Sequence, residues 1–496
     1  MFNIIAGVLA LFTLALFGTA GYLVVRALLK KFNQDQGSNM ESPQAQLPNN
    51  KSTLQPLAKN TTLLKALTIG ILSIIALIPL GIIMDMTSDR QALYHSVVDE
   101  IGRSWGEQQT LSGPVLVIPY SYFVMQEELS ADGKNRHQVK RTYQDELVIL
   151  PKKLKLDLDL KHDFRTRGIY QSLVYNAQLQ GKADFSLSHY EIANLIAFDN
   201  KNARLVFGVS SNQAIDKVNQ LEVSGDAVQL SGSLMSGTGL GSTGGLERGF
   251  NQGVIVATEP GDFSVDFAMT LRGSQSISAL PLGEQTLIKI SADWPHPSFK
   301  GLLPAEREIN AQGFSANWNI SHLTRNYPQE FIKSNQSSLT EVSANAILFE
   351  PVTHYGKIDR SVKYGLLFIV LTFIMLFIFE LGQKTSLSTI QYVLVGSAMA
   401  LFYLILLSLS EHLAFLHAYL IAACVPVLSV SAYVGSATAS AKRGGIVGLM
   451  LVSLYAVLYS ILQLEDYALL MGTGLLLVVL LILMFVTRHQ AKNAAQ

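Results

Sequence analysis

The chain has 496 residues, of which 49% are hydrophobic and only 15% are charged. Soluble proteins average roughly 25% charged residues, so this composition indicates a membrane protein. Basic and acidic residues are equal in number, 37 of each, which leaves no net positive charge to neutralise phosphates and excludes a nucleic-acid partner. The single cysteine, Cys424, cannot form an intrachain disulfide, so cysteine usage leaves the compartment open.

Seven segments are long and apolar enough to cross a bilayer, which requires roughly 20 residues. The first, residues 2–25, has no basic residue before its apolar run and is followed by Arg26. That charge placement predicts an uncleaved anchor whose N-terminus lies outside. The second segment is residues 66–84, and the other five follow a long polar region at 365–381, 389–410, 413–434, 445–463 and 467–487.

Basic residues predict the orientation of these segments, because Lys and Arg of short loops stay in the cytoplasm. The segment 26–65 is rich in them, and beyond residue 364 they recur in every second loop or end, at Lys384, Lys442, Arg443, Arg488 and Lys492. The intervening short loops carry no Lys or Arg. We therefore expect residues 85–363 outside and the C-terminus in the cytoplasm.

These boundaries divide the chain into six predicted parts. They are an N-terminal transmembrane helix (1–25), a flexible cytoplasmic linker (26–65), a second transmembrane helix (66–84), an external β-rich domain (85–363), a five-helix transmembrane bundle (364–488) and a cytoplasmic tail (489–496). The linker is predicted to be flexible because residues 33–53 are rich in Asn, Gln, Ser and Pro.

The external domain begins with a helical pattern. Within residues 87–105, apolar side chains recur four residues apart, at Leu93, Val97, Ile101 and Trp105. Charged residues occupy the other face, which predicts an amphipathic helix that continues from the second span. Gly106 is expected to end this helix, and "LSGP", residues 111–114, to form a turn into the strand "VLVIPYSYFV".

Alternating side chains then predict strands. In "KKLKLDLDLKHDF", residues 152–164, four leucines share one face and charged residues the other. Similar patterns follow in "ARLVFGVS", "NQLEVSGDAVQLSG", "GVIVAT", "FSVDFAMTL" and "TLIKISADW". Many short strands without alternating helices favour a mainly β domain, antiparallel and sandwich-like.

The glycine-rich run "SGSLMSGTGLGSTGGLERGF", residues 231–250, has a composition that could expose backbone amides to a phosphate. It lacks the Gly-Lys-Ser/Thr ending of a nucleotide-binding P-loop and opens no helix. We therefore expect a flexible or bulged loop.

The sequence predicts no catalytic, cofactor-binding or metal-binding residues and no cofactor. The histidines of the external domain lack the close spacing of metal ligands: His95, His137, His162, His189, His296 and His322. A Gly-x-Ser-x-Gly nucleophile elbow is missing from the sequence, and Cys424 lies in an apolar run where a thiol ionises poorly. A catalytic dyad assembled only by the fold remains open.

Two ionisable residues lie inside predicted spans, Glu380 near a cytoplasmic end and His417 near an external end. Transporters usually keep such groups at mid-bilayer, where they are costly and serve ion or proton paths. We therefore interpret both residues as interfacial, with Glu380 facing Lys384 or another helix to fix packing.

Three long stretches resemble the CreD family of bacterial inner-membrane proteins, in the same order. They are "SWGEQQTLSGPVLVIPY" (104–120), "WPHPSFKGLLPAEREINAQGFSANWNI" (294–320) and "FEPVTHYGKIDRSVKYGLLFIVLTFIMLFIFEL" (349–381). The resemblance runs from about residue 62 to the end of the last span and leaves residues 1–60 outside. It implies a large periplasmic domain, a cluster of helices and a link to envelope integrity, with association to the Cre two-component regulon and altered response to colicins or β-lactams. It carries over no catalytic residues.

Within these stretches, Pro295 and Pro297 fix φ and withhold backbone donors. "WPHPSF" should therefore end a strand and lie at a sheet edge or corner. Three tryptophans, Trp105, Trp294 and Trp318, lie in the external stretches. They are expected either to share an aromatic core or to form a patch that rests on lipid or meets a partner.

The leading hypothesis is an inner-membrane protein that contributes to cell envelope integrity and to the response to envelope stress, through a periplasmic domain that binds and does not catalyse. The expected partners are membrane lipids and, on the periplasmic side, another envelope protein, a lipid or peptidoglycan. The alternatives are a lipid or small-molecule transporter and a periplasmic enzyme acting on cell-wall or lipid precursors.

Overall fold

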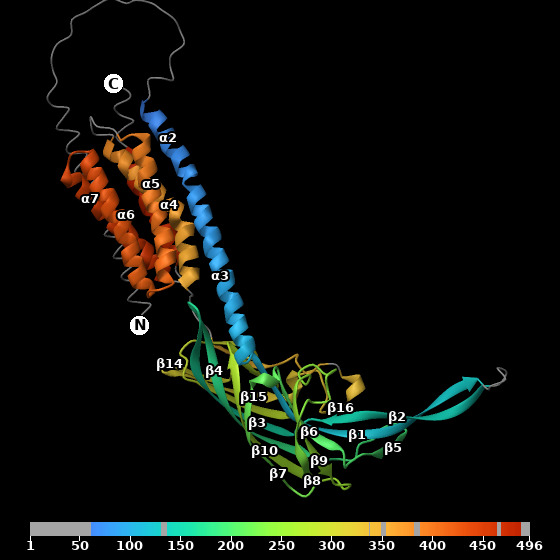
Figure 1. Ribbon diagram of the computed structural model, residues 1–496. Coiled ribbons are helices and arrows are strands. Elements are labelled where there is room, and N and C mark those ends of the chain that lie inside the picture. Colours follow the sequence, from blue (N-terminus) through green and yellow to red (C-terminus); the bar gives the residue numbers. More distant parts are fainter. Residues whose placement is uncertain are drawn as a thin grey trace, which may run out of the picture. The chain divides into compact units, whose positions relative to one another are not determined.

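The computed structural model describes residues 61–129, 136–336, 338–348, 354–380, 387–463 and 468–487. They form two compact units (Figure 1), one containing the strands within Tyr94–Pro351 and one containing the helical residues before and after it. The predicted first span, most of the predicted cytoplasmic linker and the predicted C-terminal tail lie outside the described residues.

The second predicted span forms two helices in line, α2 (Thr61–Ile75) and α3 (Leu77–Trp105), separated at Ala76. Pro79 accounts for the break, because its ring clashes with the carbonyl of the residue four positions earlier and it has no N–H to donate. Beyond Pro79, α3 continues without interruption to Trp105. The predicted amphipathic helix over 87–105 is confirmed as its second half.

The remaining helices are α4 (His354–Glu380), α5 (Thr389–Ser410), α6 (Phe415–Ala437), α7 (Ala441–Gln463) and α8 (Ala468–Thr487). Among the described residues, five helical segments are long and apolar enough to cross a membrane: Leu67–Trp105, His354–Phe377, Thr389–Ser410, Phe415–Ala437 and Ala441–Gln463. The seventh predicted span forms α8, and the total of seven spans stays a prediction.

Small residues bring α6 and α7 together. A Cβ atom added to Gly444 would lie 2.5 Å from the Ser431 carbonyl oxygen and 2.9 Å from the Gly435 Cα, so the two backbones nearly touch. Close contact of this kind is typical of membrane helices, where small residues let dispersion forces act between backbones. Farther along the pair, the Tyr419 hydroxyl donates to the Tyr455 carbonyl at 2.6 Å.

The β unit contains two sheets. The ten-stranded sheet has the order β13-β17-β11-β1-β6-β9-β8, with β2, β5 and β16 attached beside β1 or β2, and the seven-stranded sheet has the order β14-β15-β12-β3-β4-β10-β7. The strands are β1 (Gln109–Leu129), β2 (Arg136–Ile149), β3 (Lys153–Arg167), β4 (Tyr170–Ser186), β5 (Leu195–Phe198), β6 (Ala203–Val209), β7 (Ile215–Ser224), β8 (Val228–Ser236), β9 (Gly249–Val256), β10 (Asp262–Ser274), β11 (Ser276–Ala279), β12 (Gln285–Ala292), β13 (Pro297–Gly301), β14 (Glu306–Asn310), β15 (Gly313–Ser321), β16 (Glu330–Ile332) and β17 (Ala344–Leu348).

The mainly β prediction is confirmed, but the expectation of purely antiparallel sheets is wrong at two pairings. Strand β11 lies parallel to β1, and β12 lies parallel to β3. Alternation along a strand identifies which face is buried and carries no information about the direction of the neighbouring strand. The chain switches sheets between β10 and β11 and again between β11 and β12, and each switch brings it in beside a strand of the same direction.

Both sheets contribute to one hydrophobic core. The predicted leucine face of β3 is confirmed, since its four leucines are at most 3% exposed: Leu154, Leu156, Leu158 and Leu160. Phe207 of β6 meets Phe267 of β10 edge to face at 5.2 Å, which joins the two sheets. The Tyr175 hydroxyl of β4 also crosses between them and donates to the Ser276 carbonyl at 2.8 Å.

The predicted turn at residues 111–114 is wrong. Strand β1 already begins at Gln109 and runs through this segment, with a β-bulge between Ser112 and Val115 in its pairing with β6 and a cis Gly113–Pro114 peptide bond. The bulge accommodates Pro114, which cannot donate to the ladder. Gly113 has a φ of 104°, and a Cβ atom there would lie 2.7 Å from the Val206 carbonyl oxygen.

Strands β1 and β2 extend beyond the rest of their sheet as a two-stranded ribbon (Figure 1). Strand β5 pairs with β1 only at residues 120–122, and β16 pairs with β2 only at residues 147–149. Among the described strands, none other than β1 and β2 themselves pairs with residues 123–129 or 136–146. We call residues 123–129 and 136–142 the β1–β2 ribbon.

Candidate functional site at the end of strand β3

Two of the three stretches singled out in the sequence meet at the last residues of β3. The end of α3, which carries Trp105, contacts Arg165, and Trp294 contacts His162 and Phe164. Side chains alternate along a strand, so the two tryptophans approach β3 through residues of opposite faces. The end of β3 is therefore where the folded unit brings these motifs together.

Trp105 joins the end of α3 to the seven-stranded sheet. Its ring lies under two guanidinium groups, with Arg165 at 4.2 Å and Arg272 at 5.0 Å from the ring centre, and its Nε1 donates to the Tyr175 carbonyl at 3.4 Å. One turn earlier, Glu100 pairs with Arg167 at 2.6 Å. Cation–π contacts and the ion pair thus hold the last turns of the helix on β3, β4 and β10.

Gly106 ends this helix, as predicted. Its φ is 153° and its N–H donates to the Gly102 carbonyl at 2.8 Å. A Cβ atom at this position would lie 2.6 Å from the Arg272 carbonyl oxygen. Only glycine therefore allows the chain to leave the helix so close to β10.

His162 and Asp293 form a hydrogen-bonded pair beside Trp294. The distance between His162 Nδ1 and Asp293 Oδ1 is 2.6 Å, and the His162 backbone N–H donates to the same oxygen at 2.9 Å. Asp293 directly follows β12, which runs parallel to β3, and its backbone N–H still donates to the Leu160 carbonyl at 3.4 Å. Its carboxylate then takes the place of a backbone carbonyl as the acceptor for the His162 N–H. Partial burial alone would raise the pKa of Asp293, but the two hydrogen bonds and the charge of His162 lower it below its ordinary value.

Aromatic rings surround the pair. Trp294 lies edge-on to His162 at 5.4 Å, to Phe164 at 6.1 Å and to His296 at 6.1 Å. The side chains of His162 and Asp293 are 31% and 38% exposed, so a ligand or partner has access to them. Among the described residues, the His162 side chain hydrogen-bonds to Asp293 and to no serine, threonine or cysteine. The arrangement can accept or donate a proton and offers an aromatic surface.

The prediction for "WPHPSF" is confirmed. Strand β12 ends at Ala292, and Pro297 opens β13, which is an edge strand of the other sheet. The three tryptophans do not share one aromatic core, and the alternative of a patch that rests on lipid or meets a partner stays a prediction. Trp318 is 2% exposed, contacts Phe299 and donates to the Leu302 carbonyl at 2.8 Å, whereas Trp105 and Trp294 are half-buried.

The glycine-rich run, residues 231–250, is packed within the β unit. Its pairing contains a bulge between Leu230 and Leu234, which confirms the bulged form of the prediction. Leu240 and Leu246 are fully buried, and the Thr238 hydroxyl donates to the Leu246 carbonyl at 2.6 Å. These anchors give the run a structural role.

In the helical unit, Glu380 and His417 lie on different helices and have different surroundings. Glu380 Oε1 accepts hydrogen bonds from the Leu387 backbone N–H at 2.7 Å and from the Tyr392 hydroxyl at 3.2 Å. This confirms the prediction that Glu380 fixes packing against another helix, here α5. His417 is exposed in the first turn of α6.

Two buried or half-buried charged groups were missed from the sequence. Glu411 accepts from the Tyr355 hydroxyl at 3.2 Å and lies 3.7 Å from Arg90. Arg325 is 6% exposed, and its guanidinium donates to backbone carbonyls, including that of Tyr327 at 3.2 Å. Burial lowers the pKa of Arg325. Neither position follows a local pattern, since each depends on groups brought in by other elements.

The His162–Asp293 pair was also missed, because its members stand 131 positions apart and no short motif joins them. The other histidines of the external domain do not assemble a metal centre. Within the described residues, no three or more His, Cys, Asp or Glu side chains come close enough to hold a metal ion.

Comparison with known proteins gives the family. The family model described as "Inner membrane protein CreD" matches residues 61–491. The chain is 32% identical over 424 residues to the inner membrane protein CreD of Escherichia coli strain K12, which covers 84% of this chain and 90% of that protein. Both the resemblance seen in the three motifs and its start after the first 60 residues are confirmed. The chain therefore belongs to the CreD family of inner membrane proteins.

Proposed function

We propose that this protein contributes to the integrity of the bacterial cell envelope and to the response to envelope stress of the β-lactam or colicin type, through a β unit that binds a partner without catalysis. In this proposal the chain has seven spans, the N-terminus and residues 85–363 lie in the periplasm, and the C-terminus is cytoplasmic. The distribution of Lys and Arg among the short loops supports this orientation.

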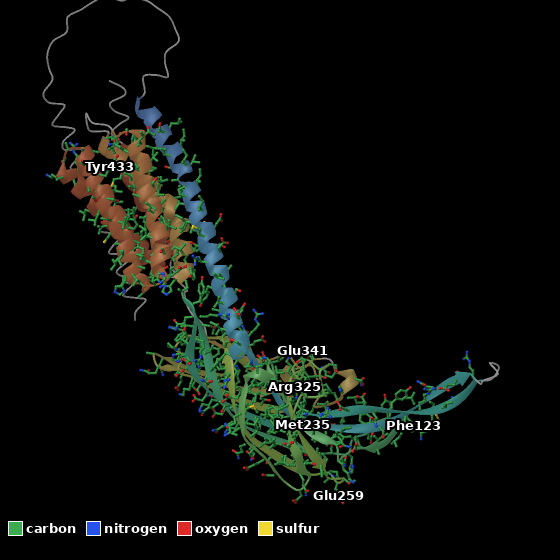
Figure 2. All side chains as sticks on the ribbon, in the orientation of Figure 1. Phe123, Met235, Glu259, Arg325, Glu341 and Tyr433 are labelled. Atoms are coloured by element: carbon green, nitrogen blue, oxygen red, sulfur yellow. The ribbon has the colours of Figure 1, made fainter. Side chains whose placement is uncertain are left out.

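The β1–β2 ribbon is the observation that carries the binding proposal. A two-stranded ribbon is marginally stable in water, because it buries little apolar surface. This one is braced by its own side chains: Lys140 lies 4.1 Å above the Phe123 ring, and Arg141 Nε donates to Glu128 at 2.7 Å. Figure 2 shows Phe123 on this ribbon, away from the body of the sheets.

The ribbon presents apolar and polar side chains together. Met125 is 54% exposed and Tyr143 at its base is 37% exposed. Beyond Phe123, whose N–H donates to the Asn194 carbonyl at 3.1 Å, both strand edges can add a further strand. The exposed side chains can provide specificity, as in β-strand addition. Ordering the β1–β2 ribbon costs conformational entropy, and the ribbon lies outside the hydrophobic core that would offset this cost. Binding to an envelope protein, a lipid or peptidoglycan would explain why the chain keeps it.

A periplasmic enzyme is the second candidate, and the His162–Asp293 pair is the observation that favours it. A histidine held by a carboxylate is the usual form of a general base. The pair also has a structural explanation, since Asp293 replaces a missing ladder acceptor at the end of β12. The His162→Asn variant keeps hydrogen bonding at the ring position but cannot act as a general base near neutral pH.

The test is complementation of a deletion strain, read as β-lactam susceptibility and envelope permeability. We expect rescue by the full chain, by the chain without residues 1–60 and by His162→Asn. We expect failure when residues 123–142 are replaced by Asn-Gly, which joins Tyr122 to its partner Tyr143. Met125→Glu should weaken rescue, while Leu287→Glu, at an apolar residue 42% exposed on β12, is the matched control.

Full rescue by the ribbonless chain would contradict the ribbon proposal. Loss of rescue in His162→Asn, with a normally folded β unit, would favour the enzyme instead. Loss of rescue only when the helices beyond α3 are exchanged for a single anchor would move the function into the membrane and favour a transporter.

A further inference from the structure

An open pocket with charged and hydroxyl side chains in its lining lies at one end of the seven-stranded sheet, where β3 and β10 begin and β4 and β7 end. Its volume is about 440 Å³, within the range of roughly 300–1,000 Å³ typical of small-molecule sites. Its lining residues are contributed by four adjacent strand ends and the residue before β3: Lys152, Lys153, Asp184, Phe185, Ser186, Ser224, Asp262, Phe263 and Ser264. This zwitterion cavity, as we call it below, shares no residue with the β3 end or the ribbon.

Opposite charges line the cavity without pairing. Lys153 and Asp184 stand directly opposite each other in the antiparallel ladder, yet within the described residues neither makes an ion pair shorter than 4.0 Å. Elsewhere on the same sheet such pairs do close, with Lys182 and Asp266 at 3.6 Å and Lys289 and Asp157 at 3.9 Å. The cavity thus keeps an ammonium and a carboxylate apart where neighbouring positions bring them together.

The strands that carry these charges are held by contacts on both faces. Phe185 and Phe263 are opposite each other in register, stack with ring centres 4.8 Å apart and are at most 3% exposed. On the other face of the same strands, the Ser186 hydroxyl donates to Asp262 at 2.6 Å. The stacked rings hold β4 and β10 together behind the charged face, so the backbone positions of Asp184 and Asp262 are set before a ligand binds.

We propose that this cavity binds a small zwitterion, meaning an amino acid or a short peptide with a free ammonium and a free carboxylate. Lys152 and Lys153 would hold the carboxylate, and Asp184 and Asp262 would hold the ammonium. Two lysines and two aspartates make the lining neutral overall, so a ligand with a single net charge leaves one side unmatched. A neutral sugar can use the serine hydroxyls but neutralises neither unpaired charge, whereas a zwitterion satisfies both with charge-assisted hydrogen bonds.

This inference goes beyond the envelope role proposed above, because it concerns a small molecule and different strands. It is tested by isothermal titration calorimetry of the full-length protein in detergent micelles. The probe is alanylalanine, and the comparison ligands are N-acetylalanine, which lacks the ammonium, alaninamide, which lacks the carboxylate, and N-acetylglucosamine, which is uncharged.

We expect saturable binding of alanylalanine and at least tenfold weaker binding of each comparison ligand, the loss that follows from removing one charged hydrogen-bond partner. Lys153→Met and Asp184→Asn should each weaken alanylalanine binding about tenfold for the same reason. Lys155→Met and Asp157→Asn are matched controls on the same face of β3 outside the lining, and should stay within about twofold.

Several results would overturn the proposal. They are no saturable binding of alanylalanine, equal affinity for N-acetylalanine or alaninamide, or equal loss in the Lys155→Met control. Preferential binding of N-acetylglucosamine would replace the zwitterion with a neutral sugar. Because the ligand series uses the unmodified protein, the outcome does not depend on whether a variant folds.

Discussion

Replacing Trp105 by alanine removes the contacts that hold the end of α3 on the seven-stranded sheet. Each guanidinium over its ring, from Arg165 and Arg272, is worth about 0.5–1 kcal/mol at a partly exposed site. Truncating a fully buried tryptophan costs about 3–5 kcal/mol, so half-burial accounts for roughly 2 kcal/mol. We therefore expect Trp105→Ala to lower the free energy of unfolding of the β unit by about 3 kcal/mol.

A loss of that size should lower the melting temperature by roughly 6–12 °C, given about 2–4 °C per kcal/mol for a domain of this size. The assay is thermal unfolding of the full-length protein in detergent, followed by the β signal in circular dichroism. Arg103→Ala is the control, because Arg103 is exposed on the same turn of α3 and its Nε donates to the Asp99 carbonyl of its own helix at 3.4 Å. If the melting temperature of Trp105→Ala lies within about 2 °C of that of Arg103→Ala, which corresponds to no more than about 1 kcal/mol, the contacts of Trp105 do not stabilise the β unit as proposed.

Three further predictions follow from named contacts. Because the pKa of Asp293 is lowered in the folded protein, its contribution to stability is present above its ordinary value of 3.8 and is lost as the pH falls through the folded value. Asp293→Asn should therefore be less stable than the wild type at pH 7 and should lose less stability on acidification, as unfolding curves between pH 2 and 7 would reveal by a smaller slope. Gly181→Val should cost about 1–3 kcal/mol or more through overpacking, since a Cβ atom there would lie 2.1 Å from the Phe267 ring, and a melting temperature equal to that of the wild type would refute it. Gly444→Leu should separate α6 from α7 and lower the thermal stability of the helical unit, whereas Gly445→Leu, whose Cβ meets nothing within 4 Å, should not; equal effects of the two would argue against close packing at this crossing.

The strands themselves were accessible from the sequence because alternation is a local property. The leucine face of β3 and the buried faces of β10 and β12 are read correctly from period 2. The segments predicted at β6 and β9 are also strands, although burial along them does not alternate. The end of α3 at Gly106 follows from local backbone preference in the same way.

The same reasoning failed at residues 111–114, where Ser-Gly-Pro has turn composition but lies within β1. A bulge and a turn draw on the same residue types, and only the partner strand β6 decides between them. Pairing direction failed for a related reason, since β1 with β11 and β3 with β12 are parallel although each strand reads like an antiparallel one.

Neither the His162–Asp293 pair nor the zwitterion cavity could be predicted from the sequence. His162 and Asp293 meet because β3 and β12 are neighbours, although 131 positions separate them in the chain. The zwitterion cavity depends on four strand ends coming together, and its lysines, aspartates and serines are unremarkable in sequence. Local composition indicated no site at either place.

The sequence by itself determined the apolar helices, the buried faces of the strands, the breaks at glycine and proline, and membership of the CreD family through three long motifs. These follow from consecutive residues, because length, hydropathy and side-chain period act over one element. Only the tertiary structure decided which strands are neighbours, which charges form ion pairs and which do not, and where β1 and β2 extend beyond their sheet. Those features depend on distant segments in contact, and many arrangements of the same strands satisfy the same local patterns.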